Sequence, residues 1–403
     1  MTAEQETQAT ASQDAASEPV PERTQRPVLC FIGESGIRLW ALTPVERLRR
    51  QFAREKVTDE IALDAARQHN GPVIFIRADA VLDQPLIPIL AKPSGLLLTG
   101  DGAEGSMALA VQAEGRHAEA VADILANGRE PSPDLHLSAR TPDELDARFW
   151  KALRKRETPY AFRLNPANRH EVEWRMFMGT YKGATDLITK HLWPRPAFMA
   201  TRWLAPRGIT PNMVTLVGAV LVFLAFWLFL EGHFGLGLAA AWLMTFLDTV
   251  DGKLARTTLT SSKWGDVFDH GLDLVHPPFW YVAWALGLAQ AGLALDTRTF
   301  WIVITAILGG YVLQRLMEGI AIKWLGLEIH IWRKVDTLFR QITARRNPNL
   351  LILTVFTLAG RPDWGLLAVA WWTVICLVLH GLQLGQALLA RRQGPLESWM
   401  AKS

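Results

Sequence analysis

The stretch FLDTVDGKLARTTLTSSKWGDVFDHGLDL, residues Phe246–Leu274, lies between two strongly apolar segments and contains five aspartates. Carboxylates beside a membrane are costly, so their spacing needs a physical explanation. Asp248 and Asp251 are three positions apart, and Asp269 and Asp273 are four apart. Each pair therefore falls on one face of a helix. Because the intervening segment returns the chain, we expect the two faces to meet.

The surrounding sequence predicts six membrane helices between residues 211 and 390. Met213–Leu230 contains no charge and is long enough to cross a bilayer core. The second and fifth apolar runs are short, so their helices must include flanking residues. The six predicted runs are Met213–Leu230, Leu236–Leu247, Leu274–Leu295, Phe300–Ile322, Leu350–Gly360 and Trp364–Ala390.

The charge distribution predicts the orientation of these helices. The predicted outer loops are short, whereas the predicted inner segments carry Lys and Arg at positions 253, 256, 263, 323, 333, 334, 340, 345, 346, 391 and 392. This asymmetry follows the positive-inside rule. We therefore expect a multi-pass protein of the inner cell membrane, with its N-terminal part, active site and C-terminus in the cytoplasm. The net charge of +3 is modest, and no nucleic-acid partner is expected.

Before the membrane part, the sequence predicts a Rossmann-like α/β domain. Apolar runs that read as strands alternate with helical segments at about Pro44–Lys56 and 117–128, the second ending at Gly128. This alternation favours a parallel or mixed sheet with helices on both faces. TPDELDARFWKALRKR begins with Thr141 followed by Glu144, a capping pattern that predicts a closing amphipathic helix. The four expected strands are RPVLCFIG, GPVIFIRADAVLD, SGLLLTGDG and MALAVQAEG.

The predicted organisation has five parts. The polar segment 1–27 has no signal-peptide pattern and is expected to be disordered. It is followed by the α/β domain at 28–165, a junction with interfacial helices at 166–210, the six-helix domain at 211–392 and a tail at 393–403. Cys30 and Cys376 lie in apolar segments far apart, and we expect both to be buried free thiols.

The aspartates are best explained as ligands of a divalent cation. Converging carboxylates repel one another, and Mg²⁺ or Mn²⁺ would remove that repulsion. The alternative is a set of solvated acids balanced by Lys253, Arg256 and Lys263. The full pattern D-x-x-D-G-x-x-A-R-x8-G-x-x-x-D-x-x-x-D is too specific for that alternative. Its glycines, Gly252 and Gly265, allow close backbone approach, and Arg256 can pair with a phosphate.

This pattern resembles the signature of the CDP-alcohol phosphotransferase family, and the resemblance extends over about residues 205–390. It implies transfer of a substituted phosphoryl group, such as a phosphatidyl group, from a CDP-linked lipid or CDP-alcohol to an alcohol, with release of CMP. It also implies two metal ions, a lipid bilayer around the protein and a homodimer.

The resemblance also assigns roles to individual residues, although Asp266 lies outside the signature and receives none. By this resemblance the metal ligands are Asp248, Asp251, Asp269 and Asp273, with Asp273 also the general base, and the donor-binding residues are Gly252, Arg256, Gly265, Ser262 and, from a P-N-x-x-T motif, Asn212 and Thr215.

The acceptor is less well defined by the sequence. Arg315 and Glu318 lie within the fourth predicted membrane helix, where ionisable residues indicate function. Arg345 and Arg346 precede the fifth helix and could bind the phosphate of a phosphorylated alcohol together with Arg315; the alternative for this pair is ordinary positive-inside flanking. His276 could shape the acceptor pocket or could pack around the Pro277–Pro278 kink.

The N-terminal domain resembles a sugar-nucleotide nucleotidyltransferase, as in membrane synthases with a fused cytidylyltransferase domain that make di-inositol phosphates. FIGESGIRLWALTP resembles the phosphate loop, but Glu34 stands near its first glycine and PVERLRR replaces the expected Pro-Lys pair. RADAVLD resembles the strand that carries a metal-binding acid, here Asp79. A glutamate in the loop would repel a triphosphate, so we expect a degenerate domain.

Three alternatives to a single-function transferase remain open. A bifunctional enzyme would also make its own CDP-alcohol in the N-terminal domain. An aspartate-rich membrane prenyltransferase would use paired acids and Mg²⁺, but it lacks the D-G-x-x-A-R segment. A membrane scaffold without enzymatic activity would tolerate loss of Asp273.

Overall fold

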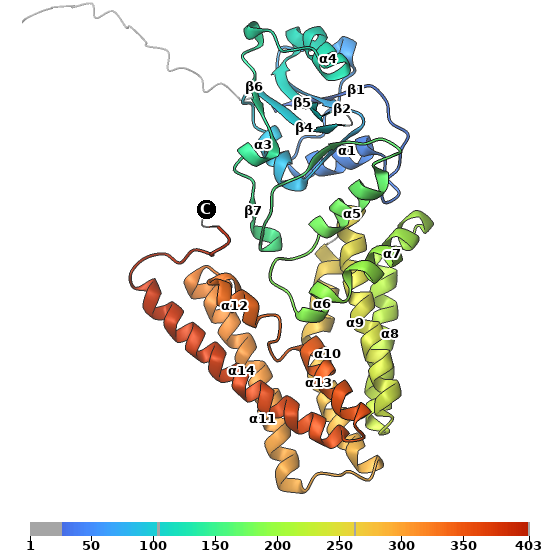
Figure 1. Ribbon diagram of the computed structural model, residues 1–403, viewed down its shortest axis with the longest axis vertical. Helices are drawn as coiled ribbons and strands as arrows, with labels where there is room; N and C mark the ends of the chain where they lie inside the picture. The colour runs from blue at the N-terminus through green and yellow to red at the C-terminus, as the bar shows by residue number, and fades with distance from the viewer. Residues whose placement is uncertain (1–25, 103–104, 262, 402–403) are drawn as a thin grey trace, which may run out of the picture.

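The computed structural model describes residues 26–102, 105–261 and 263–401, except for the side chains of Ala152, Lys263, Trp264, Asp266, Phe268, Asp269 and His270. Nearly all of the predicted disordered tail thus lies outside the described residues. A domain built on a β-sheet lies at one end of the molecule and a bundle of long helices at the other, with short helices between them (Figure 1). This arrangement agrees with the predicted order of a sheet-containing domain followed by a helical domain.

The N-terminal domain contains a mixed sheet that, within the described residues, has seven strands. β1 pairs with β2 in parallel, whereas β2 and β4 both pair with β5 in the antiparallel sense. β4 also pairs in parallel with β6 and β9, and β9 pairs antiparallel with β3. The strands are β1 (Val28–Ile32), β2 (Pro72–Arg77), β3 (Ala80–Leu82), β4 (Leu96–Gly102), β5 (Gly105–Glu114), β6 (Ser138–Arg140) and β9 (Ala161–Arg163).

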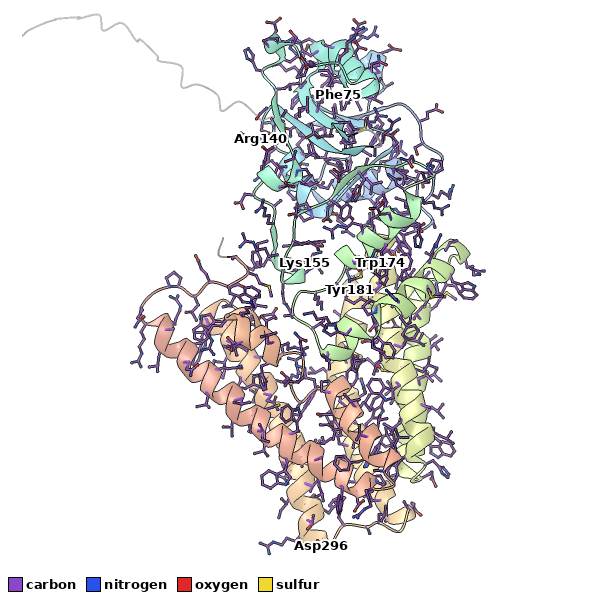
Figure 2. The ribbon with its side chains drawn as sticks, in the orientation of Figure 1. Phe75, Arg140, Lys155, Trp174, Tyr181 and Asp296 are labelled. Carbon is purple, nitrogen blue, oxygen red and sulfur yellow. The ribbon has the colours of Figure 1, made fainter. Side chains whose placement is uncertain are left out.

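Helices cover both faces of this sheet because its strands are apolar on both sides. Ile74 and Ile76 of β2 pack in one core with α1 (Pro44–Arg54) and α3 (Ile87–Leu90). The alternate β2 residues, including Phe75, pack in a second core with α4 (Ala118–Asn127) (Figure 2). α4 stops at Gly128, whose φ of 68° is left-handed, as predicted. Along the chain, the short α2 (Leu63–Ala66) follows α1 and precedes β2.

The helix predicted over TPDELDARFWKALRKR is wrong. Thr141 and Glu144 form the expected capping box, but only a 3₁₀ turn follows. The chain then forms a hairpin of β7 (Phe149–Trp150) and β8 (Lys155–Arg156). Lys155 is buried and donates to the carbonyl of Gly179, which the sequence places 24 residues away. Long-range contacts therefore outweigh the local helical pattern at this point.

The junction consists of three helices, α5 (Arg169–Gly179), α6 (Leu187–His191) and α7 (Pro194–Leu204). Trp40 of the N-terminal domain packs against Phe198 of α7, with ring centroids 5.6 Å apart. The same hydrophobic core includes Phe177 of α5 and Leu254 of the helical domain. One continuous core thus ties the two domains together.

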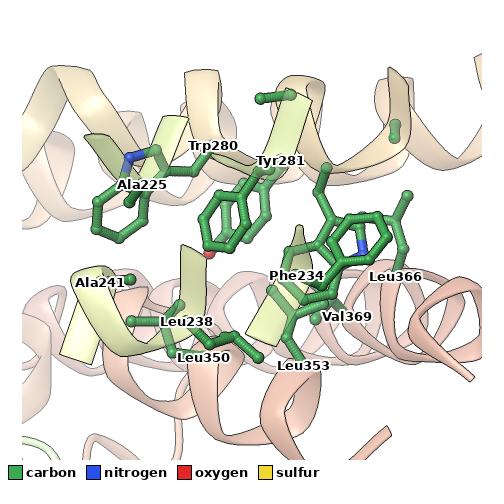
Figure 3. Close-up of a cluster of buried hydrophobic side chains, with 14 of the residues drawn as sticks. Ala225, Phe234, Leu238, Ala241, Trp280, Tyr281, Leu350, Leu353, Leu366 and Val369 are labelled. Atoms are coloured by element: carbon green, nitrogen blue, oxygen red, sulfur yellow. The ribbon is translucent and has the colours of Figure 1, made fainter. Parts of the chain in front are cut away.

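Six helices of the C-terminal domain share one hydrophobic core (Figure 3). They are α8 (Pro211–Leu230), α9 (Phe234–Thr257), α10 (Lys263–Gln290), α11 (Thr297–Ile320), α13 (Arg346–Leu358) and α14 (Pro362–Arg391), with α12 (Lys334–Phe339) outside the core. Among the described residues, four helices are long and apolar enough to cross a membrane: α8, α9, α14 and α11 with its π-helical extension to Leu325. The prediction of six spans is thus supported for four of them.

The end of the bundle away from the N-terminal domain is closely packed. A Cβ at Gly287 of α10 would lie 1.8 Å from the carbonyl oxygen of Phe229 in α8. The indole of Trp284 is fully buried and donates to the carbonyl of Pro362 at 3.1 Å. Only glycine at position 287 lets these two backbones touch.

Candidate active site

A cavity of about 540 Å³ lies where the helical domain meets the junction. Its walls come from α9, α10, α11, the segment before α13 and the junction loop that begins at Tyr181. In Figure 2, Tyr181 marks this level of the molecule and Asp296 marks the opposite end of the bundle. The predicted site residues in the cavity wall are Asp248, Gly252, Arg256, Asp273, Arg315, Arg345 and Arg346.

Asp248 and Asp273 come from different helices and face one guanidinium. Arg346 Nη2 lies 2.5 Å from Asp248 Oδ2, and Arg346 Nη1 pairs with Asp273 Oδ1. The two predicted helix faces therefore meet for these residues. Arg346, which stays a predicted acceptor-binding residue, bridges the two carboxylates in the structure.

Asp251 lies behind this pair in a buried position. Its Oδ2 accepts a hydrogen bond of 2.6 Å from Thr215 Oγ1 on α8. Thr215 is in place because α8 begins at Pro211, with Thr210 capping the amide of Met213. The P-N-x-x-T motif thus touches the signature through its threonine.

These carboxylates fit a divalent cation. Asp251 Oδ1 is buried, and no donor within the described part of the chain reaches it. A buried carboxylate oxygen without a partner is costly unless a ligand satisfies it. Carboxylate oxygens are also the donors that Mg²⁺ prefers, and the cluster has two such groups in the cavity wall beside Asp251.

Other predicted residues are less fully placed. Asn212 is exposed on the first turn of α8, and neither it nor Gly265 in the first turn of α10 is among the described residues of the cavity wall. Ser262 lies outside the described residues. Asp269 belongs to α10, but its side chain, like that of Asp266, lies outside the description.

A second cluster in the cavity wall is formed around Glu318. Glu318 on α11 accepts hydrogen bonds from Arg315 at 2.9 Å and from Arg345. His330 Nε2 lies 3.0 Å from the same carboxylate. Burial lowers the pKa of His330 to about 3, so its imidazole is neutral.

Glu318, His330 and His380 bring ligand-type atoms within 4.8 Å of one another. Glu318 is the one carboxylate of this group and pairs with two arginines, whereas Asp248 and Asp273 share a single arginine between two carboxylates. The negative charge at Glu318 is therefore already outweighed, and its arginines would repel a metal ion. Burial also lowers the pKa of nearby Arg340 to about 9. The cluster is therefore organised as an arginine-holding network rather than a metal centre.

Sequence reasoning missed a set of residues that the junction brings to the cavity. Lys253 is buried, with Nζ 3.1 Å from the ring centroid of Tyr181 and 3.2 Å from the carbonyl of Thr180. Asn347 Nδ2 donates to Asp186 Oδ1 at 3.0 Å. The segment YKGATDLITK supplies these contacts, but the sequence alone placed it only within the predicted junction at 166–210.

One further contact joins the N-terminal domain to the cavity wall. Arg154 in the β7–β8 hairpin forms an ion pair of 2.7 Å with Glu328. His276, in contrast, packs in the helix interior, with Nδ1 2.7 Å from the carbonyl of Leu272 and its ring 4.5 Å from that of Trp280. This geometry favours the packing role that was one of its two interpretations.

In the N-terminal domain, the residues that resemble a phosphate loop form a closed turn. Leu39 and Leu42 exchange backbone hydrogen bonds of 2.8 and 3.0 Å, and Leu39 and Trp40 are buried. Asp79 forms ion pairs with Arg77 at 2.8 Å and Arg163 at 2.9 Å. Burial raises the pKa of Asp79, but the two arginines outweigh it and bring that pKa below its usual value.

The two cysteines are buried and free, as predicted. Burial raises the pKa of the Cys30 thiol to about 11, so the group is protonated at neutral pH. Neither cysteine is among the cavity-wall residues that the structure describes.

Comparison with known proteins identifies the helical part. Residues 208–344 match the CDP-alcohol phosphatidyltransferase family model, so this part of the chain is a CDP-alcohol phosphatidyltransferase domain. The resemblance predicted from the aspartate pattern is thereby confirmed.

Individual relatives match shorter or longer segments. A bifunctional IPC transferase and DIPP synthase of Rubrobacter xylanophilus is 29% identical over 188 residues, covering 45% of this chain and 38% of the relative. A phosphatidylinositol phosphate synthase of Streptomyces avermitilis is 35% identical over a segment that covers 28% of this chain and 44% of the relative. An archaetidylinositol phosphate synthase of Pyrococcus horikoshii is 34% identical over a segment that covers 27% of this chain and 55% of the relative. The matches thus span about half or less of each relative.

Proposed function

We propose that this chain is an integral membrane, Mg²⁺-dependent transferase. It moves a substituted phosphoryl group, such as a phosphatidyl group, from a CDP-linked donor to an alcohol and releases CMP. The observation that carries this proposal is the cavity that Asp248 and Asp273 share with Gly252 and Arg256. The relatives named as phosphatidylinositol phosphate and archaetidylinositol phosphate synthases support it.

The residues divide the reaction between them. Gly252 and Arg256 lie where the diphosphate of the donor would bind, the glycine allowing close approach and the guanidinium pairing with phosphate oxygens. Asp273 accepts the proton of the acceptor hydroxyl. The acceptor oxygen then bonds to the distal phosphorus, and the bond from that phosphorus to the bridging oxygen breaks, so that CMP leaves.

Asp248, Asp251, Asp269 and Asp273 would hold two divalent cations, Mg²⁺ or Mn²⁺. When bound, these ions supply positive charge that stabilises the transferring phosphoryl group. Thr215 fixes the orientation of Asp251 through its 2.6 Å hydrogen bond. Asn212, Gly265 and Ser262 remain predicted donor contacts.

The acceptor is proposed to be a phosphorylated alcohol. Lys or Arg occupies eight of the described positions in the cavity wall, and Asp or Glu occupies five. Glu318 holds Arg315 and Arg345 in the wall of the cavity that Asp248 and Asp273 also line, where the arginines could bind an acceptor phosphate. The eight cations are Arg154, Lys182, Lys253, Arg256, Arg315, Arg340, Arg345 and Arg346, and the five acids are Asp186, Asp248, Asp273, Glu318 and Glu328.

We further infer six spans, with α10 and α13 completing the bundle in the inner cell membrane and the N-terminal domain in the cytoplasm. The shared core of the six helices and the positive-inside charge pattern support this topology. A homodimer is expected from the family resemblance. We also infer that the N-terminal domain is degenerate, because Asp79 is paired with two arginines and the loop around Trp40 is closed.

The test uses the full chain in liposomes with labelled CDP-diacylglycerol, Mg²⁺ and a panel of free and phosphorylated alcohols. We expect CMP release with a phosphorylated acceptor and near-complete loss of release in Asp273→Asn. Absence of CMP with every acceptor would refute the proposal. CTP and the same phosphates test the bifunctional alternative, since pyrophosphate release would show an active N-terminal domain.

A further inference from the structure

Three arginines on one face of α1 contact the end of the signature helix α9. Arg47 Nη1 donates to the carbonyl of Thr257 at 2.5 Å, and Arg50 Nη1 donates to the carbonyl of Thr258 at 2.9 Å. Arg54 Nη2 lies 3.5 Å from Ser261 Oγ. The positions i, i+3 and i+7 place all three on the same side of α1.

These contacts satisfy groups that a helix cannot satisfy by itself. The last carbonyls of an α-helix have no intrahelical donor, and a positive charge is favourable at this end. The hydroxyls of Thr257 and Thr258 both donate back to the carbonyl of Leu254. The carbonyls of Thr257 and Thr258 instead receive guanidinium donors from the N-terminal domain.

The segment that is held in this way leads directly from the donor site. Arg256 and Ser261, on either side of the capped carbonyls, both line the cavity. Between them, Leu259 has a φ of 55°, a left-handed conformation that is uncommon for a branched side chain. Such a conformation persists only where the surroundings impose it. The α1 arginines are among the groups that surround it.

We propose that Arg47 and Arg50 are positioning residues for the CDP-linked donor. They hold the last turn of α9 so that Arg256 meets the donor diphosphate. The proposal depends on the proposed function only for the identity of the ligand. The N-terminal domain then acts as a clamp, meaning that it holds the end of α9 at the donor site, instead of as a nucleotidyltransferase.

The departure of this domain from the nucleotidyltransferase pattern agrees with that role. The segment PVERLRR, where a Pro-Lys pair was expected, is the first part of α1 and supplies Arg47 and Arg50. In the adjoining loop, Leu39 and Trp40 pack in one core with Val250 and Leu254 of α9. Residues that would face a triphosphate thus face the membrane domain.

The test compares Arg47→Ala and Arg50→Ala with Arg49→Ala in the full-length protein. Arg49 is on the same helix but pairs with Glu60 of its own domain, so it is a matched control. CDP with Mg²⁺ is the probe, and its dissociation constant is measured well below the melting temperature. We expect Arg47→Ala and Arg50→Ala each to weaken CDP binding roughly ten-fold, because CDP binding must then restore the order that one charged hydrogen bond supplies to the end of α9, and Arg47→Lys to recover part of it.

Amide hydrogen exchange supplies a readout that does not depend on the ligand. Arg50 is exposed, so Arg50→Ala should leave the domain folded if Arg47→Ala does not. We expect faster exchange at Thr258–Ser261 in Arg50→Ala, with unchanged exchange in β2 and β5 and no change in Arg49→Ala. The positioning role of Arg47 and Arg50 would be refuted if exchange at Thr258–Ser261 did not change in Arg50→Ala. It would also be refuted if Arg49→Ala weakened CDP binding equally. If exchange is faster in Arg50→Ala but the wild-type protein does not bind CDP, the support of the α9 end by the α1 arginines stands, and the proposal that the ligand is a CDP-linked donor is refuted.

Discussion

Replacing Arg346 by glutamine should make the protein bind Mg²⁺ more tightly. The guanidinium of Arg346 forms ion pairs with both Asp248 and Asp273, and the Arg346 side chain is only 15% exposed. A cation entering this cluster must displace it from both carboxylates. A hydrogen bond to a charged group contributes about 1.5–3 kcal/mol, so removing the competitor should tighten Mg²⁺ binding about ten- to hundred-fold.

The same replacement should destabilise the metal-free protein. Breaking a buried ion pair and leaving its partner uncompensated costs about 3–5 kcal/mol. Mg²⁺ should reverse this loss, because a ligand that binds only the folded state at a hundred times its dissociation constant stabilises by about 2.7 kcal/mol. Arg346→Gln should therefore melt below the wild type in chelator and approach it in Mg²⁺.

The assay is thermal unfolding in detergent across a Mg²⁺ titration, with Arg315→Gln as the control. Arg315 lines the same cavity but pairs with Glu318, so its loss should change Mg²⁺ affinity much less. An equal Mg²⁺ response in wild type and Arg346→Gln would refute the reasoning. It would mean that Arg346 and the metal do not compete for these carboxylates.

Three other changes give separate predictions. Thr215→Val removes the hydrogen bond to Asp251 and should weaken Mg²⁺ binding at least about ten-fold in the same titration, whereas Thr215→Ser should retain it. In Gly183→Ala, the new Cβ would lie 2.2 Å from the carbonyl oxygen of Arg154 and should displace the β7–β8 hairpin, so CMP release should fall although the sheet stays protected from hydrogen exchange. Burial raises the pKa of Asp83 to about 6, so its contribution to stability is full below about pH 4 and is lost as the pH rises through 6. Asp83→Asn should thus raise stability at pH 7 by up to about 3 kcal/mol and flatten this pH dependence, and unchanged unfolding curves at pH 5 and 7 would contradict it.

The parts of the fold that sequence could predict are those set by local pattern. The predicted strand runs and the stop at Gly128 are found in the structure, and the predicted six-helix domain begins at residue 211, where α8 starts. The spacing of the aspartates predicted that two helix faces meet, and Asp248 of α9 and Asp273 of α10 do line one cavity. These features depend on residues close together in the chain.

The features that sequence missed depend on residues far apart. Arg346 reaches Asp248 across 98 positions, and Arg47 reaches Thr257 across 210. The segment after Glu144 has a helical pattern, but Lys155 is drawn to Gly179 and the chain forms a hairpin. In each case tertiary packing selects among conformations that the local sequence permits equally well.

The contact of Gly287 with Phe229 has a mechanical consequence. Two backbones in direct contact cannot be compressed, whereas the polar cavity at the other end of α9 and α10 contains space. Any side chain at position 287 must therefore separate α10 from α8, whereas changes of side-chain size at the cavity end of the bundle have space around them. The α1 arginines contact α9 at this cavity end, so the N-terminal domain supports the bundle where its own packing is least dense.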